Sequence, residues 1–383
     1  MFKLLKNGLC YSPQNIGKKD ILVIYEKIHK IEDRIDEKTL FETEVIDCSN
    51  KILCPAFIDQ HVHIIGGGGE EGPGSRIPEI MLSDIITAGV TTVVGLLGLD
   101  AVTRGISSLL AKATALEEEG ITTYIYTGSY SIPTSSLTGK PIDDLSLISK
   151  VIGIGEVAIS DYRSTHPTLQ QLKELAWEAR AGALIGKKAG VVHFHVGDGK
   201  RGIDPIMELL RESDFPINMF VPTHLNRNKK LFQEAVDYCK QGGNVDLTAG
   251  EKSGIGYSVP EALEELYESK VNMSKVTVSS DGNGSVPSGD GGSTSVGKVT
   301  ALYEDIVSCY KRGKVPLETI LSTVTSNVAT VLGLYPTKGC LEPGSDADIL
   351  VLDKDSLHLD RVIAKGQVLI EDGKVIKKGR YEQ

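Results

Sequence analysis

Two histidines separated by one residue, His61 and His63, stand at the end of an apolar run in the stretch FIDQHVHIIGGGG. Alternate side chains of a β-strand point to the same side, so both imidazoles would face one point. Imidazole is a common ligand of zinc and of other divalent metal ions. A polar pair on an exposed strand is the alternative interpretation, and the apolar flanks disfavour it. The pair therefore predicts part of a metal site.

Further residues of metal-ligand type stand at the ends of other apolar runs. His195 closes VVHFHVG, and His224 closes FVPTHLN. Asp281 closes VTVSSDGNG, and Glu156 falls near the end of VIGIGEVAIS. Four imidazoles and two carboxylates exceed the needs of one ion, so they predict two metal ions that share a bridging carboxylate and a bridging hydroxide. His193 lies on the same side of its strand as His195 and is an alternative ligand.

The elements that must position these residues alternate along residues 55–339. Eight apolar, strand-like runs are each followed by an amphipathic helical stretch or a long loop. Eight such units predict an α/β fold of the (β/α)8 barrel type, in which the active site lies at the carboxyl ends of the strands. A doubly wound open sheet uses the same alternation, but eight units without a leftover strand favour closure. The Gly-rich stretch 286–298 is predicted to move over the mouth of the barrel.

The two ends of the chain have a different pattern. Residues 1–54 and 340–383 consist of short β-type runs, and the Asp-Gly pair in EDGKV is typical of a hairpin turn. Neither segment has enough apolar residues to fold alone. We expect the two segments to pair into one small β-sandwich-like domain beside the barrel.

Composition restricts the class of function. The chain has 383 residues, and 41 basic against 51 acidic residues give a net charge of −10. This balance disfavours a nucleic-acid or anionic-membrane surface, because either needs a basic excess. No apolar run approaches the roughly 18–20 residues of a membrane span. The chain begins without the apolar segment of a signal peptide, and its cysteines form no Cys-x-x-Cys pair, so we expect a cytoplasmic protein with reduced thiols.

Five motifs carry a resemblance to a known family: FIDQHVHIIGGGGEEGP, AGVTTVVGLLG, AISDYRS, VPTHLNRN and SSDGNGS. They resemble the isoaspartyl dipeptidases, metallopeptidases of the amidohydrolase superfamily, over nearly the whole chain. The resemblance implies two zinc ions per subunit, a homo-oligomer, and hydrolysis of the β-aspartyl bond of isoaspartyl dipeptides by a zinc-bridged hydroxide. It implies that His61 and His63 bind the buried ion and that His195 and His224 bind the more exposed one. Asp281 would be both a metal ligand and the general acid/base.

One position departs from the family pattern. The best-known members bridge the two ions with a CO2-modified lysine on the fourth strand, whereas the matching residue here is Glu156, next to an inserted Gly155. Glutamate carries a permanent carboxylate, but its shorter side chain requires a closer backbone. The alternative is a bridge from elsewhere, such as Lys150, which stands at the start of the strand and therefore at the opposite end of the barrel. With Glu156 as the bridge, activity is expected to be independent of dissolved CO2.

An isoaspartyl dipeptide offers one ammonium group and two carboxylates, so its site needs an anion and at least one guanidinium. The resemblance assigns the ammonium group to Glu70, with Glu71 as the alternative, and assigns the developing oxyanion to Tyr130. It also implies that Arg163 and Arg227 bind carboxylates. The remaining substrate-binding positions that it implies are Gly68, Ser285 and Leu99, the last in place of the family's usual threonine.

Two other classes of function stay open at this point. A cyclic-amide hydrolase of the dihydropyrimidinase type, or a deacetylase, would share the barrel and the metal ligands but would not require Glu70. A non-catalytic relative that uses the barrel as a binding scaffold is disfavoured, because such proteins lose ligand histidines and this chain has the full set. The favoured partner is a small acidic dipeptide, with no nucleic acid and no membrane.

Overall fold

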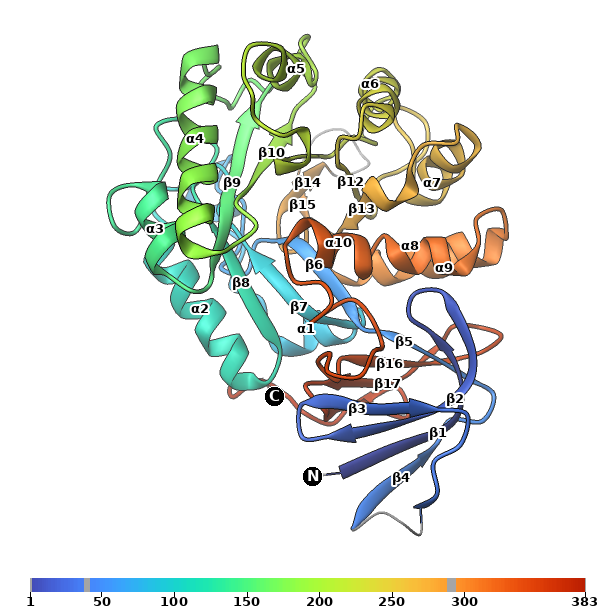
Figure 1. The fold of residues 1–383 in the computed structure, drawn as a ribbon. Coiled ribbons are helices and arrows are strands. Elements are labelled where there is room, and N and C mark those ends of the chain that lie inside the picture. The colour runs from blue at the N-terminus through green and yellow to red at the C-terminus, as the bar shows by residue number, and fades with distance from the viewer. Residues whose placement is uncertain (1, 38–41, 288–293, 383) are drawn as a thin grey trace.

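The computed structural model describes residues 2–37, 42–287 and 294–382. Figure 1 shows its two parts one above the other. The larger part comes from the middle of the chain and consists of strands surrounded by helices, and the smaller part is a β-sheet made from both chain ends. The site predicted from the sequence belongs to the larger part.

Eight strands of the larger part follow one another in chain order: β6 (Phe57–Val62), β7 (Val90–Gly95), β8 (Thr122–Thr127), β9 (Val151–Ile159), β10 (Val191–Val196), β11 (Phe220–Thr223), β12 (Val245–Thr248) and β13 (Val276–Ser279). Strands β6 to β11 form one six-stranded parallel sheet, and β12 pairs with β13 in parallel. Backbone hydrogen bonds join the two sheets at both seams. Leu225 N donates to Asp246 O over 3.3 Å, and His63 N donates to Gly282 O over 2.9 Å.

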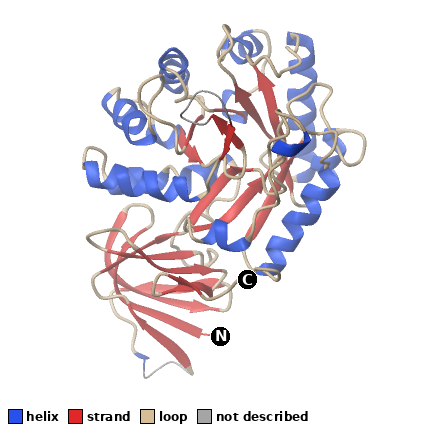
Figure 2. Cartoon of the chain, turned by 180° about the vertical axis from the view of Figure 1, so that it is seen from behind, coloured by secondary structure: helices blue, strands red, loops and turns tan. Residues whose placement is uncertain are grey.

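A helix follows each of these strands in the sequence, and most of the helices lie around the outside of the strands, as Figure 2 shows. They are α1 (Leu82–Ile86), α2 (Ile106–Glu119), α3 (Pro141–Leu147), α4 (Leu169–Gly186), α5 (Asp204–Arg211), α6 (Lys229–Lys240), α7 (Val259–Glu268), α8 (Thr300–Arg312), α9 (Leu317–Ser322) and α10 (Ser326–Val331). The predicted alternation of strands and helices is confirmed. Helices α1, α3, α9 and α10 have only five to seven residues, which is too short a stretch to show helical periodicity in the sequence. None of the helices in the described ranges combines the length and the apolarity that a membrane span requires.

One end of the strands is closed by α10. Val328 and Leu332 pack in one buried cluster with Ile58, Val94 and Ile152, which lie on β6, β7 and β9. This apolar floor covers the amino ends of the strands. The polar residues at the carboxyl ends of the strands therefore lie at the end opposite α10, where the sequence predicts the active site of a barrel.

The smaller part contains β1 (Phe2–Tyr11), β2 (Asn15–Ile24), β3 (Lys27–Glu32), β4 (Thr43–Asp47), β5 (Lys51–Pro55), β16 (Ile349–Asp353), β17 (Leu359–Ala364), β18 (Gln367–Glu371) and β19 (Lys374–Val375). These strands form one nine-stranded sheet in which β5 pairs with β16, so both chain ends contribute strands. The long β1 pairs with β4 along its first half and with β5 near its end, which joins the strands into one hydrogen-bonded sheet. The Asp372-Gly373 turn joins β18 to β19 with positive φ at both residues, which is the predicted hairpin.

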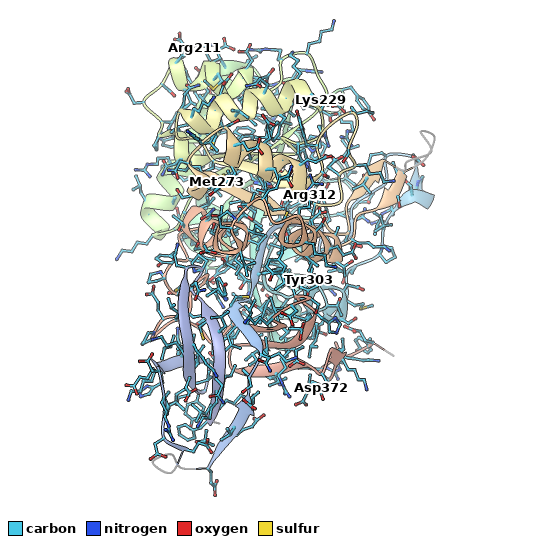
Figure 3. The ribbon with its side chains drawn as sticks, turned by 90° about the vertical axis from the view of Figure 1, so that its right-hand side faces the viewer. Arg211, Lys229, Met273, Tyr303, Arg312 and Asp372 are labelled. Carbon is cyan, nitrogen blue, oxygen red and sulfur yellow. The ribbon has the colours of Figure 1, made fainter. Side chains whose placement is uncertain are left out.

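The two parts meet through buried polar contacts. Tyr303 of α8, labelled in Figure 3, donates its hydroxyl hydrogen to the Leu357 carbonyl in the loop between β16 and β17. Lys338 lies on the segment that leads into β16, and only 3% of its side chain is exposed. Its Nζ lies 2.8 Å from Asp346 Oδ2, contacts the Asp348 carboxylate, and donates to Thr122 Oγ1 of β8 over 2.6 Å. Lys338 therefore joins the two parts: it forms buried ion pairs with Asp346 and Asp348, and a hydrogen bond to β8 of the larger part.

Replacement of Lys338 by methionine is expected to lower the free energy of unfolding by about 3–5 kcal/mol at pH 7, because it removes the buried counter-charge of the Asp348 carboxylate. The matched control is Lys27→Met: Lys27 Nζ also pairs with Asp346, over 2.6 Å, but its side chain is 50% exposed. Lys27→Met should lower the free energy of unfolding by at most about 1 kcal/mol. Urea denaturation midpoints compare the two variants, and equal losses would contradict the burial argument.

The effect of Lys338→Met should also depend on pH. Burial would raise the pKa of Asp346, but Lys338 and Lys27 together outweigh burial and hold that pKa below its usual value. A carboxyl group whose pKa is depressed by folding contributes stability above its unfolded pKa of about 3.9 and loses it as the pH falls further. The difference in the free energy of unfolding between wild type and Lys338→Met should therefore be largest at pH 7 and become smaller below about pH 4. Denaturation midpoints measured from pH 3 to pH 7 check this.

Candidate active site

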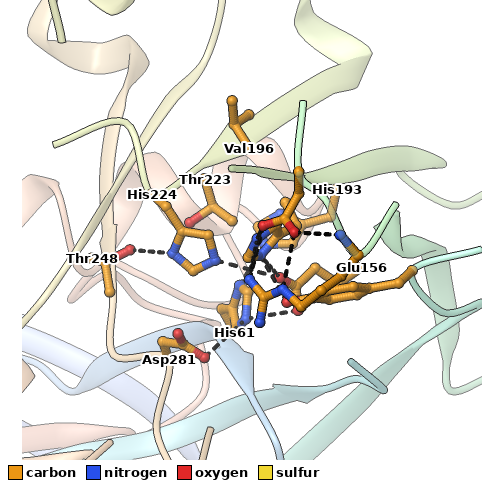
Figure 4. A network of polar contacts seen from close by, with 12 residues as sticks. His61, Glu156, His193, Val196, Thr223, His224, Thr248 and Asp281 are labelled. Atoms are coloured by element: carbon orange, nitrogen blue, oxygen red, sulfur yellow. Dashed lines mark hydrogen bonds and ion pairs between the residues drawn. The ribbon is translucent and has the colours of Figure 1, made fainter. Parts of the chain in front are cut away.

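The predicted metal ligands come together at the carboxyl ends of the strands, and Figure 4 labels four of them, His61, Glu156, His224 and Asp281. They are His61 on β6, His63 directly after it, Glu156 on β9, His195 on β10, His224 after β11 and Asp281 after β13. The four histidines and Glu156 are buried, and the Asp281 side chain is 13% exposed. Residues from five strands, up to 220 positions apart in the chain, thus converge on one site.

Glu156 lies between two pairs of histidines. Its Oε2 is 3.2 Å from His61 Nε2 and 3.7 Å from His63 Nε2. Its Oε1 is 2.6 Å from His195 Nδ1 and 3.4 Å from His224 Nε2. One oxygen therefore faces each pair, which is the geometry that a carboxylate bridging two adjacent cations requires.

A β-bulge brings Glu156 to this position. On β10, Val192 and Phe194 pair with Ile154 and Val157, so two residues of β9 oppose the single residue His193. These two are Gly155, the inserted glycine of the sequence analysis, and Glu156. A bulge re-aims the side chain next to it, and bulges are frequent beside active sites. A Cβ on residue 155 would lie 2.8 Å from His193 Cβ, so only glycine fits there without a shift.

Lys150, the alternative source of a bridge, lies at the other end of β9. Its Nζ contacts Glu117 Oε2 and donates to Thr123 Oγ1 over 2.8 Å. Both partners belong to the side of the strands away from the histidines. Lys150 is therefore not part of this cluster.

His224 and Asp281 follow very short strands and turn inward through an unusual backbone conformation. Their φ angles are 62° and 51°, in the left-handed region that residues with a Cβ adopt at an energetic cost. Asp281 Oδ1 then lies 3.3 Å from His61 Nε2 and 3.2 Å from His63 Nε2. Gly284 allows this approach, because a Cβ there would lie 2.4 Å from the same oxygen.

The second ring nitrogen of three histidines has a partner behind the site. His61 Nδ1 is 2.8 Å from His193 Nε2, and His224 Nδ1 is 2.7 Å from Thr248 Oγ1. His195 Nε2 is 3.0 Å from Asp161 Oδ2. Such partners fix the orientation and tautomer of metal-binding imidazoles. Thr248 and Asp161 were not predicted from the sequence, and His193, predicted there as an alternative ligand, lies behind His61.

The donor atoms fit a divalent metal ion. Three groups have ligand atoms within 4.8 Å of one another, and His193 belongs to none of these groups among the described residues. They are His61–His63–Glu156, His61–His224–Asp281 and Glu156–His195–His224. Within the described chain, the buried atoms His61 Nε2 and Glu156 Oε2 have no hydrogen-bond partner. Nitrogen and carboxylate donors of this kind suit zinc, and also cobalt or manganese.

The electrostatics of the cluster favour a neutral His224 beside ionised carboxylates. Burial lowers the pKa of His224 to about 3, with Arg227 as a further cause, so its imidazole is neutral and able to bind metal. Burial would raise the pKa of Asp281, but the neighbouring imidazoles, His61 foremost, outweigh it and hold that pKa well below its usual range. Burial raises the pKa of Tyr130 well above its ordinary value, and the negative Glu156 adds to the effect. Tyr130 is therefore a neutral phenol that can donate a hydrogen bond.

Four of the predicted substrate-side residues lie together beside the metal ligands. Tyr130 Oη is 2.9 Å from His195 Nδ1, and the Arg163 guanidinium lies 5.4 Å from the centre of the Tyr130 ring. Ser285 Oγ donates to Glu70 Oε1 over 2.9 Å. The same Glu70 oxygen is 3.7 Å from Arg163 Nη1. An anion, a guanidinium and two hydroxyls are thus available to one small polar ligand.

The alternative ammonium-binding residue, Glu71, is turned elsewhere. Its Oε1 accepts a hydrogen bond from Thr294 N over 3.2 Å, at the start of β15 (Thr294–Val296). That strand pairs with β14 (Ser285–Pro287), and residues 288–293 of the predicted mobile stretch lie outside the described residues. Glu70, not Glu71, faces Arg163.

The three other predicted substrate residues line the loops around this point. Gly68 has a φ of 76°, and a Cβ there would lie 2.3 Å from Ser75 O, so this backbone requires glycine. Arg227 donates from Nη1 to Val196 O over 3.1 Å, which holds its guanidinium beside β10. Leu99 is 38% exposed on the loop after β7 and offers no hydrogen-bonding group.

A ring of parallel strands with histidines and carboxylates at its carboxyl end is typical of metal-dependent hydrolases. A model of the amidohydrolase family matches residues 257–379. Dihydroorotase from Aquifex aeolicus is 27% identical over 459 residues, which cover 99% of this chain and 100% of that protein. Dihydropyrimidinase from Brevibacillus agri NCHU1002, 16% identical with a TM-score of 0.70 over 99% of this chain and 97% of that one, shares the fold. The protein is thus a hydrolase of the amidohydrolase superfamily.

The similarity to one solved structure is much higher. The β-aspartyl dipeptidase from Fervidobacterium islandicum AW-1, solved in complex with the dipeptide β-Asp-Leu, is 42% identical to this chain. The match covers 98% of each chain with a TM-score of 0.92. The chain therefore belongs to the β-aspartyl (isoaspartyl) dipeptidase family, which confirms the resemblance found in the sequence.

Proposed function

We propose that this dipeptidase hydrolyses the β-aspartyl bond of isoaspartyl dipeptides and uses two zinc ions per subunit. The observation that carries the proposal is the position of Glu156, one oxygen of which faces each histidine pair. The relative solved with β-Asp-Leu supports the choice of substrate. His61 and His63 would hold one ion and His195 and His224 the other, with Glu156 shared and Asp281 as a further ligand.

The substrate-side residues suit the charges of such a dipeptide. Glu70 would bind the α-ammonium group, and Ser285, hydrogen-bonded to Glu70, would bind a neighbouring carboxylate oxygen. Arg163 and Arg227 would bind carboxylates, since guanidinium can donate two parallel hydrogen bonds to one carboxylate. Gly68 would bring its backbone close to the substrate, and Leu99 would contact it without a hydrogen bond.

The residues around the metal site would divide the work of amide hydrolysis. A bound pair of divalent cations supplies a water of lowered pKa and polarises the substrate carbonyl. Asp281 would take the proton from the attacking water and deliver it to the leaving amine, which an amide requires. The neutral Tyr130 hydroxyl would donate a hydrogen bond to the carbonyl oxygen as negative charge develops on it.

We also propose a domain organisation and an oligomeric state for the protein. The strand ring would be a closed (β/α)8 barrel spanning residues 55–339, supported by the hydrogen bonds at both seams, with residues 1–54 and 340–383 as a separate domain. The protein would form a homo-oligomer. The exposed apolar residues of α4, namely Trp177, Leu184 and Ile185, support this. Light scattering after gel filtration would give the mass.

The function is tested by a metal count together with a comparison of substrates. We expect two zinc ions per chain and hydrolysis of β-Asp-Leu but not of α-Asp-Leu. Dihydrouracil and an N-acetyl sugar would be assayed beside them. A chain that holds no zinc, or that retains full turnover after exhaustive chelation, would contradict the proposal.

A cyclic-amide hydrolase is the second candidate, because dihydroorotase matches the chain over its full length. The two candidates differ in their need for Glu70, which has no ammonium group to bind in a cyclic amide. Glu70→Gln should abolish turnover of β-Asp-Leu. Faster hydrolysis of dihydrouracil or dihydroorotate than of β-Asp-Leu by the wild type would favour the second candidate.

Replacement of Arg227 by methionine is expected to raise KM for β-Asp-Leu by about 10- to 100-fold with little change in kcat. The reason is that a charge-assisted hydrogen bond is worth about 1.5–3 kcal/mol. Steady-state kinetics check this. The matched control is Arg312→Met, since Arg312 pairs with Glu264 at the surface formed by α7 and α8 (Figure 3) and should leave KM unchanged. An unchanged KM in Arg227→Met would show that Arg227 does not bind the substrate.

A further inference from the structure

Asp161 is a buried carboxylate that contacts a proposed metal ligand on one side and a substrate-side arginine on the other. It follows β9 and is 5% exposed. Its Oδ1 accepts from Arg163 N over 2.8 Å and from Arg163 Nε over 3.0 Å. Its Oδ2 accepts from Arg163 Nη2 over 2.8 Å and lies 3.0 Å from His195 Nε2. Arg163 thus contacts both oxygens of Asp161, and His195 contacts Oδ2.

The contacts of His195 define which of its nitrogens carries the hydrogen. Nδ1 is the nitrogen that faces Glu156 Oε1, at 2.6 Å, so Nδ1 is the one that would bind metal. A ligand nitrogen must be unprotonated, so the hydrogen has to be on Nε2. An ionised carboxylate is an acceptor only. Asp161 therefore favours the tautomer in which His195 can bind a metal ion.

Arg163 would favour the opposite tautomer if Asp161 were absent. Arg163 Nη2 lies 3.2 Å from His195 Nε2, and a guanidinium can only donate. Without a competing acceptor, this N–H would donate to Nε2 and leave the hydrogen of the ring on Nδ1, the metal-facing atom. Asp161 prevents this arrangement because it accepts from both groups at once.

The chain keeps space for this carboxylate. Gly197 stands two residues after His195 on the strand edge, and a Cβ there would lie 2.5 Å from both Cβ and Oδ2 of Asp161. Any other residue at position 197 would push Asp161 away from His195. The glycine is thus a second, independent sign that the position of Asp161 matters.

We propose that Asp161 is a positioning residue that couples metal binding at His195 to substrate binding at Arg163. It fixes the hydrogen of His195 on Nε2, and it holds the Arg163 guanidinium through three hydrogen bonds to the backbone and side chain. The substrate half of this coupling rests on the proposed function of Arg163. The metal half depends only on the chain and the ion.

The first test is the zinc affinity of Asp161→Asn, measured by competition with a chelator and without any substrate. An amide has one acceptor oxygen in place of two, so it cannot satisfy both Arg163 and His195. Loss of an outer partner of a ligand histidine costs about 10- to 100-fold in metal affinity, and we expect that loss at one of the two ions. The absorption spectrum of the cobalt-loaded variant should change as well. Glu264→Gln, which removes an ion-paired carboxylate on α7, is the control and should change neither readout.

The second test separates the coupling from a general structural role. Arg163→Met alone should raise KM for β-Asp-Leu and leave zinc affinity at the wild-type value. The double variant Asp161→Asn/Arg163→Met should recover most of the zinc affinity lost in Asp161→Asn, because no guanidinium then donates to His195 Nε2. Wild-type zinc affinity in Asp161→Asn, or no recovery in the double variant, would overturn the proposal. Since zinc and chelator are the only reagents in the affinity measurements, they remain valid if β-Asp-Leu proves not to be the substrate.

Discussion

Replacement of Asp281 by alanine is expected to lower kcat for β-Asp-Leu by about 10²–10⁴-fold, the usual effect of losing a general acid/base. Asp281 reaches the site through its left-handed backbone, and its pKa lies well below the ordinary range. It is thus ionised at neutral pH and able to accept a proton. Steady-state kinetics at saturating substrate measure the loss.

Because Asp281 is also a proposed metal ligand, the metal content of the variant must be measured alongside. The role in proton transfer is separated by a β-aspartyl anilide, whose leaving amine needs less protonation than that of a dipeptide. The deficit of Asp281→Ala should be smaller with the anilide than with β-Asp-Leu. Near-normal turnover of the dipeptide by a zinc-loaded variant would remove Asp281 from this role.

The second large effect is expected from Glu156→Gln, which keeps the shape of the side chain and removes its charge. Each oxygen of Glu156 faces one histidine pair, so the change weakens both metal positions at once. We expect fewer than two zinc ions per chain and a loss of kcat of at least about 100-fold. The lower limit follows because even an outer partner of a ligand is worth 10- to 100-fold. Elemental analysis of the purified variant and steady-state kinetics give the two values.

Removal of CO2 tests whether Glu156 itself, and not a CO2-modified residue, supplies the bridging carboxylate. Wild-type apoenzyme reconstituted with zinc in bicarbonate-free buffer should regain full activity, because Glu156 needs no modification. Glu156→Lys should stay inactive with or without bicarbonate, since the bulge at Gly155 brings the backbone too close for a longer side chain. Deletion of Gly155 in the Glu156→Lys variant should make recovery depend on bicarbonate. Loss of wild-type recovery in bicarbonate-free buffer would show that Glu156 is not the bridge.

The strands and most ligands could be predicted because each signal is local. An apolar run that ends in histidine or aspartate, as at His195 and Asp281, is visible within seven to nine residues of sequence. The carboxyl ends of barrel strands meet at one rim, so the order of the runs was enough to bring their last residues together. The six proposed ligands do converge in the structure.

The partners behind the ligands could not be predicted, because they depend on contacts across strands. Thr248 contacts His224 from the next strand. Asp161 lies on a loop and contacts His195, and it has room there because residue 197 is a glycine. Threonine and aspartate are common in loops, so neither residue type signals such a contact. For Asp161, its place two residues before Arg163 was the only available sign.

The continuous sheet of the smaller part has a consequence for synthesis on the ribosome. Strand β5 ends at residue 55 and needs β16, which begins at residue 349, as its neighbour on one side. At about 5–20 residues per second, translation of the intervening chain takes roughly 15–60 s. During that time the nascent amino-terminal strands carry an unpaired edge, the kind of surface to which other chains add. Chaperone demand and truncation-induced aggregation should therefore be concentrated in the interval before the last strands emerge.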